Sequence, residues 1–186
     1  MSISRPFILL FLVIAWCGFA ASLVTHTATF WTINLENQFP YLWMLNFVVF
    51  LAAAPAIAVG RDLAGASRRP DYWKLALRYT PPIFRYATYV IFFYGFVNFF
   101  VCLWLLDFAT PGYFHGQTAL LEHGAFLRYL TAVEFQKKQA YEVRLFSGGQ
   151  MIFFFISAAI LTSAKNAPAD FERDVNVLIP PVGSVR

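Results

Sequence analysis

Three histidines and several carboxylates are the residue types in this chain that most often bind metals or take part in catalysis. His26, His115 and His123 lie in or beside the connections between apolar stretches. A zinc site built from such residues usually shows a close spacing, such as His-x-x-x-His or His-x-x-Glu-His. Neither spacing occurs here. We therefore predict no metal ligand and no bound cofactor, and we interpret the histidines as interfacial residues that meet water and lipid headgroups.

A nucleophile is also poorly supported by the residue patterns. Ser147-Gly148-Gly149 lacks the Gly-x-Ser-x-Gly frame of a nucleophile elbow, so we interpret it as a flexible hinge. Glu134 follows Glu122 and precedes Glu142 at spacings that form no diagnostic acid–base pair. We predict no catalytic residue and no enzymatic activity. A lipid-modifying enzyme that uses His123 and Glu134 stays open as a second alternative.

The composition indicates that all of these residues are held by helices in a lipid bilayer. Apolar residues make up 59% of the 186 residues and charged residues 13%, whereas a soluble domain carries about 25% charged residues. The mean hydropathy is +0.58. Four stretches without Asp, Glu, Lys or Arg approach the length of about 20 residues that crosses a membrane, namely 6–25, 41–60, 86–106 and 148–164. The predicted fold is all-α, a single domain over 1–186 with four transmembrane helices.

Basic residues between these stretches predict the orientation. The connection 61–85 carries a clear Lys/Arg excess, whereas the connection 26–40 carries none. Since cytoplasmic loops hold that excess, we place 61–85 and both termini in the cytoplasm, in a membrane of the bacterial inner membrane type. The residues expected to contact anionic lipid headgroups are Arg61, Arg68, Arg69, Lys74, Arg78 and Arg85. We also expect a short interfacial helix over 71–79, and no binding of nucleic acid.

The connection before the fourth stretch has its own helical pattern. Residues 117–146 contain no proline, and their apolar side chains recur at spacings near three and four. Glu134 and Lys138, and then Lys138 and Glu142, are oppositely charged pairs four residues apart, which support a helix. This predicts an amphipathic extracytoplasmic helix over about 117–146 that bends at Gly148-Gly149 into the fourth span. We expect the tail, 165–186, to be extended or disordered.

Two polar residues lie inside the predicted spans. Asn46 and Asn98 need hydrogen-bond partners within the protein, because lipid offers none. We interpret them as helix–helix contacts. A small transporter or channel that uses both residues is the first alternative.

These patterns favour a non-catalytic membrane protein that acts by contact. It would be an accessory or assembly subunit of a membrane complex, or a protective protein that binds another membrane protein. The partner is the lipid bilayer together with a second membrane protein or another copy of the chain. The residues expected to make the contact are Arg128, Glu134, Lys137, Lys138 and Glu142 in the extracytoplasmic connection, and Phe92, Phe96, Phe99 and Phe100 in the third span.

Overall fold

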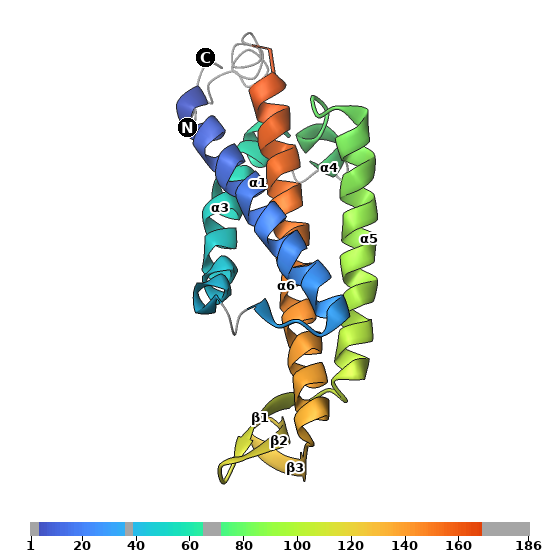
Figure 1. Ribbon diagram of the computed structural model, residues 1–186. Helices are drawn as coiled ribbons and strands as arrows, with labels where there is room; N and C mark the ends of the chain where they lie inside the picture. The colour runs from blue at the N-terminus through green and yellow to red at the C-terminus, as the bar shows by residue number, and fades with distance from the viewer. Residues whose placement is uncertain (1–3, 36–38, 65–71, 169–186) are drawn as a thin grey trace, which may run out of the picture.

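The computed structural model describes residues 4–35, 39–64 and 72–168, and Figure 1 shows how they are arranged. In chain order the elements are α1 (Arg5–Ala28), the 3₁₀ turns η1 (Thr29–Trp31) and η2 (Pro40–Met44), α3 (Leu45–Leu63), α4 (Tyr72–Ala76), α5 (Pro82–Leu105), the strands β1 (Thr110–Phe114), β2 (Gln117–Glu122) and β3 (Ala125–Tyr129), and α6 (Ala132–Asn166). The chain is mostly helical, as predicted, but it also contains a small sheet.

Among the described residues, four helices are long and apolar enough to cross a membrane. They cover 5–31, 40–63, 82–105 and 132–166, and each overlaps one of the four predicted spans, although the last begins well before the predicted 148–164. Three of them begin with proline in the first turn. Proline is tolerated there because the first N–H groups of a helix have no partner within the helix. The four predicted helices are therefore confirmed.

Helix α6 forms the centre of the bundle. Its most apolar window is 61% buried, compared with 22% for each of the other three long helices, which pack around it. Glycines allow the close approach. At Gly18 of α1, an added Cβ would lie 2.4 Å from the ring of Phe154 of α6, and at Gly95 of α5 it would lie 3.4 Å from the carbonyl oxygen of Gly148. Any larger residue at Gly18 would push α1 away from α6.

The two ends of the bundle differ. The start of α1, α4 and the end of α6 lie together at one end, which we call the α4 end (Figure 1). At the other end, the sheet end, α5 and α6 extend beyond α1 and α3 and carry the three strands. The sheet thus lies next to α5 and α6, away from the other long helices.

The prediction of a helix over the first half of 117–146 is wrong. Residues 110–129 instead form an antiparallel sheet with strand order β1-β2-β3. Each two-residue loop of this sheet is a His-Gly pair with positive φ at both positions: 48° and 78° at His115 and Gly116, and 49° and 84° at His123 and Gly124. Two successive positive φ values are those of the type I′ turn, which joins antiparallel strands and interrupts any helix. The all-α prediction is corrected accordingly.

The second half of the range 117–146 is helical, as predicted, but the helix does not bend where we expected it to. Helix α6 begins at Ala132 and continues without interruption through Gly148 and Gly149 to Asn166. Both glycines keep a helical backbone, so the interpretation of Ser147-Gly148-Gly149 as a hinge is also wrong. Gly148 is required for a different reason, because a Cβ at this position would lie 2.6 Å from Nδ2 of Asn98.

The helix predicted over 71–79 is shorter than expected. Helix α4 covers Tyr72–Ala76, and residue 71 lies outside the described residues. Ala76 and Leu77 are buried, and Leu77 belongs to a core cluster with Ile8 of α1 and Ile160 of α6. These two side chains therefore pack on the bundle and do not reach toward lipid headgroups.

Candidate functional site

His26, near the end of α1, lies at the centre of a set of polar side chains inside the bundle. Its Nδ1 is 3.1 Å from Oγ of Ser147, and its Nε2 is 2.6 Å from the hydroxyl oxygen of Tyr94. Only 2% of His26 is exposed. The prediction that His26 meets water and headgroups is wrong, because hydroxyl groups from α5 and α6 occupy both ring nitrogens.

Asn98 joins α5 to α6 beside this histidine. Its Nδ2 donates to the carbonyl oxygen of Arg144 at 3.3 Å, and its Oδ1 accepts from Nε of Arg144 at 3.0 Å. The Arg144 guanidinium also lies over the ring of Phe30, 3.9 Å from its centroid. The predicted role of Asn98 in helix–helix hydrogen bonding is confirmed.

Gln150 of α6 extends these contacts to the remaining long helix. Its Oε1 accepts from the hydroxyl of Ser22 of α1 at 3.2 Å, and its Nε2 donates to Oδ1 of Asn46 of α3 at 2.9 Å. The helix–helix role of Asn46 is therefore confirmed as well. We call the whole set the polar layer; its members are Ser22, His26, Asn46, Tyr94, Asn98, Arg144, Ser147 and Gln150.

The pairing of Ser147 with His26 has the spacing of a nucleophile and its base, but its surroundings do not suit catalysis. Ser147 is 2% exposed. It lies in the middle of α6, where the backbone N–H groups bond within the helix and cannot stabilise an oxyanion. The second nitrogen of His26 faces a tyrosine and not an orienting carboxylate. The arrangement is suited to holding three helices together.

Most of the polar layer was missed by reasoning from the sequence. Arg144, Ser147 and Gln150 follow one another three residues apart on α6, and Ser22 and His26 are four apart on α1. Those spacings place polar groups on one face of a helix, which is the signal that could have found them. The identity of the facing helix, however, depends on how the four long helices pack.

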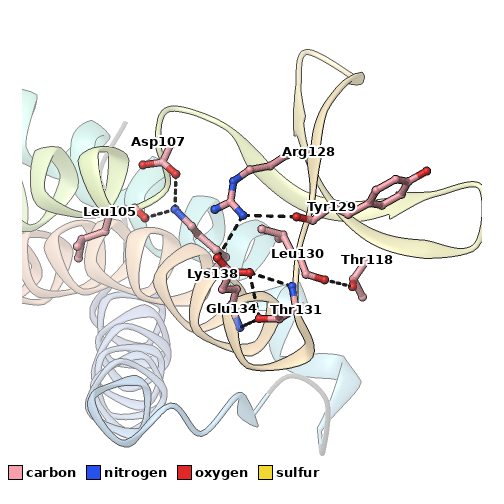
Figure 2. A network of polar contacts seen from close by, with 9 residues as sticks. All are labelled: Leu105, Asp107, Thr118, Arg128, Tyr129, Leu130, Thr131, Glu134 and Lys138. Atoms are coloured by element: carbon pink, nitrogen blue, oxygen red, sulfur yellow. Dashed lines mark hydrogen bonds and ion pairs between the residues drawn. The ribbon is translucent and has the colours of Figure 1, made fainter.

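A second set of polar contacts joins the sheet to the two helices beneath it (Figure 2). Lys138 of α6 donates from Nζ to the carbonyl oxygen of Leu105, at the end of α5, and to Oδ2 of Asp107, both at 2.7 Å. The Lys138 side chain is only 12% exposed. Its charge lies where a helix C-terminus favours a cation. Lys138, predicted to contact a partner, therefore fixes α5 against α6.

The first turn of α6 completes this set. Thr131 and Glu134 form a capping box, in which the threonine hydroxyl accepts from the Glu134 N–H and the Glu134 carboxylate accepts from the Thr131 N–H at 2.9 Å. The carboxylate also pairs with Arg128 of β3 at 3.2 Å, and the Thr118 hydroxyl donates to the Leu130 carbonyl oxygen at 2.8 Å. We call these contacts, with those of Lys138, the junction network. Glu134 and Arg128 thus have structural roles in addition to any contact with a partner.

The other residues predicted to contact a partner are more accessible. Lys137 is exposed and Glu142 is half-buried. The four phenylalanines of α5 are between 46% and 54% exposed. Three of them, Phe92, Phe96 and Phe99, line one groove between α3, α5 and α6, whereas Phe100 packs edge-on against Phe96 and Phe99.

The basic residues predicted to bind lipid headgroups lie near the α4 end, except Arg68 and Arg69, which are outside the described residues. Arg61 and Lys74 are exposed. Arg78 lies over the ring of Tyr79, 4.6 Å from its centroid. Arg85 is half-buried.

Burial also affects a tyrosine at this end. It raises the pKa of the Tyr72 phenol, an effect that the charge of Arg61 opposes. Tyr72 contributes to the close packing here, because its hydroxyl lies 2.7 Å from where a Cβ on Gly60 would be.

Within the ranges that the structure describes, no group of three or more His, Cys, Asp or Glu residues is placed to hold a metal ion. His115 and His123 occupy the two turns of the sheet and do not join His26 in the bundle. Comparison of the chain with models of known protein families, with curated proteins and with solved structures found no match.

Proposed function

We propose that this chain is an integral membrane protein that acts by contact with a second membrane protein, with the sheet as its docking element. The sheet end would face outward from a membrane of the bacterial inner membrane type, and the α4 end would face the cytoplasm. The single observation that carries the proposal is strand β3. All five of its residues, Ala125–Tyr129, are exposed at the open edge of the sheet.

Exposed apolar side chains on this edge support a role in binding. Phe126, Leu127 and Tyr129 are between 38% and 48% exposed, and the ring centroids of Phe126 and Tyr129 lie 4.7 Å apart. Monomeric proteins rarely expose contiguous apolar patches of large size unless the patch binds something. An edge strand also offers unpaired backbone groups to an extended segment of a partner.

The junction network supports the same role. It fixes β3 to the first turn of α6 through Arg128, and it fixes α6 to α5 through Lys138. A surface held in one position loses less conformational entropy on binding than a mobile loop does. The polar layer, in contrast, has its side chains bonded to one another, which supports a structural role and not a solute path through Asn46 and Asn98.

Site-specific photo-cross-linking in native membranes tests the proposal. A photoreactive amino acid at Leu127, an exposed position in the β2–β3 bulge, is expected to form one discrete adduct with another protein. The matched control is Tyr86 of α5, which is 73% exposed but lies near the α4 end. Leu127→Asp should also remove the partner that co-purifies in mild detergent.

Three outcomes would overturn the proposal. They are equal labelling from both positions, labelling of lipid alone, and purification of the chain alone or only as a homo-oligomer.

A further inference from the structure

A groove opens between α3, α5 and α6, and neither His26 nor Tyr94 is among its lining residues. Its volume is about 380 Å³. Phe92, Phe96 and Phe99 form one wall, and α6 forms the floor with Gly149 and Gln150. No Asp, Glu, Lys or Arg is among its lining residues. A cavity of this size suits a small ligand, because binding sites for small molecules enclose about 300–1,000 Å³.

Gly149 keeps the groove open. A Cβ at this position would meet nothing within 4 Å, whereas at Gly95 and Gly148 it would strike neighbouring side chains. Glycine inside a helix is about 1 kcal/mol less favourable than alanine. Close helix packing explains the glycines at 95 and 148, but no described neighbour explains the one at 149. Its absent side chain leaves room for a ligand.

The groove also offers hydrogen-bond donors. A primary amide carries two N–H donors. The Gln150 amide uses one on Oδ1 of Asn46, and the Asn46 amide uses one on the carbonyl oxygen of Trp43 at 3.0 Å. Both amide oxygens already accept a bond, from Ser22 and from Gln150. Each amide therefore keeps one N–H donor that is not used by these bonds, and such a neutral donor suits a ligand with an uncharged acceptor.

We propose that this groove binds the acyl chain of a membrane lipid, whose ester carbonyl accepts from the amides of Asn46 and Gln150. An uncharged apolar lining with neutral donors is complementary to such a chain and its carbonyl. The depth agrees, given the membrane insertion proposed above. Asn46 is on the first turn of α3, just after the exposed aromatic residues Tyr41 and Trp43, a type that gathers at the membrane interface where lipid esters lie.

A transmembrane helix of another protein fits this groove less well. Its backbone carbonyls already bond within the helix, so they do not need the free amide donors. The lipid site does not include β3, so it is independent of the protein contact proposed for the sheet.

The test uses a phosphatidylethanolamine with a photoreactive group on its acyl chain, added to the full chain in vesicles. Labelling of the wild-type protein should saturate, and it should concentrate on the peptides that contain residues 92–99 and 145–153. Gly149→Leu should reduce saturable labelling about tenfold, equal to about 1.4 kcal/mol. Asn46→Leu should reduce it several-fold. Ala58→Leu, at an exposed position of α3 outside the groove, is the matched control and should change nothing.

Gly149→Ala is the control for correct folding, because a methyl group at this position has no neighbour within 4 Å. Unsaturable labelling spread over all exposed apolar faces, unchanged by Gly149→Leu, would overturn the lipid site. So would protection of the groove by a protein that co-purifies. Cross-linking from Leu127 should be the same in the Gly149→Leu variant, so the two proposals can fail separately.

Discussion

The polar layer and the junction network use similar hydrogen bonds in different surroundings. In the polar layer, His26, Asn98 and Ser147 are at most 3% exposed. In the junction network, the side chains of Arg128 and Glu134 are 47% and 43% exposed. A buried donor or acceptor that loses its partner has nothing to replace it, whereas an exposed one turns to water. The two sets should therefore respond very differently to the loss of one side chain.

The two sets also hold different parts of the chain. The polar layer joins α1, α3 and α5 to α6 and so determines how the long helices pack. The junction network joins the sheet to α6, and α6 to the end of α5. Damage to the first should affect the whole bundle, while damage to the second should stay near the sheet.

The largest effect is expected for Asn98→Leu. The substitution leaves the Arg144 guanidinium without the acceptor at 3.0 Å and removes a donor from its carbonyl oxygen. Hydrogen bonds to charged groups contribute about 1.5–3 kcal/mol, and the free energy of unfolding in mild detergent should fall by about that amount. Val97→Leu, on an exposed position of the same helix, should leave it unchanged. A loss as small as that of the control would mean that the polar layer adds nothing to stability.

An intermediate and local effect is expected for Lys138→Met. The variant loses the bonds to Leu105 and Asp107, and a cation at a partly buried helix C-terminus contributes up to about 2 kcal/mol. Amide hydrogen exchange should quicken in residues 106–131 and stay unchanged around His26. Lys137→Met, at the exposed neighbouring position, is the matched control. Faster exchange throughout the bundle would contradict the separation of the two sets.

The parts of the fold that were predictable are those whose signal lies within one segment of the sequence. Each long helix follows from its own run of apolar residues, and that signal does not depend on neighbours, so all four were found. The sheet was missed because Leu120, Leu127 and Leu130 have spacings near those of a helix. His115-Gly116 and His123-Gly124 carry the stronger signal, since histidine adopts a positive φ more readily than most residues and glycine does so freely.

The candidate site was predicted only in part, for a different reason. Asn46 and Asn98 stand out as polar residues within apolar runs, and their need for a partner follows from those apolar surroundings alone. His26 does not stand out, because its position near the end of a span is equally typical of an interfacial residue. Its burial depends on Tyr94 and Ser147, which come from helices 68 and 121 residues away in sequence. No pattern in the sequence around His26 indicates that Tyr94 and Ser147 lie next to it in the fold.

The smallest effect is expected for Arg128→Ala, although Arg128 belongs to the proposed docking strand β3 and forms an ion pair with Glu134 in the junction network. Exposed ion pairs contribute about 0.2–1 kcal/mol, and salt screens them. The stability difference from wild type should therefore be below about 1 kcal/mol at low ionic strength and should vanish in high salt. Arg128→Lys, which keeps the charge, is the matched control. A salt-independent loss as large as that of Asn98→Leu, measured on the chain purified without a partner, would mean that the pair is buried, and the contrast drawn between the two networks would not hold.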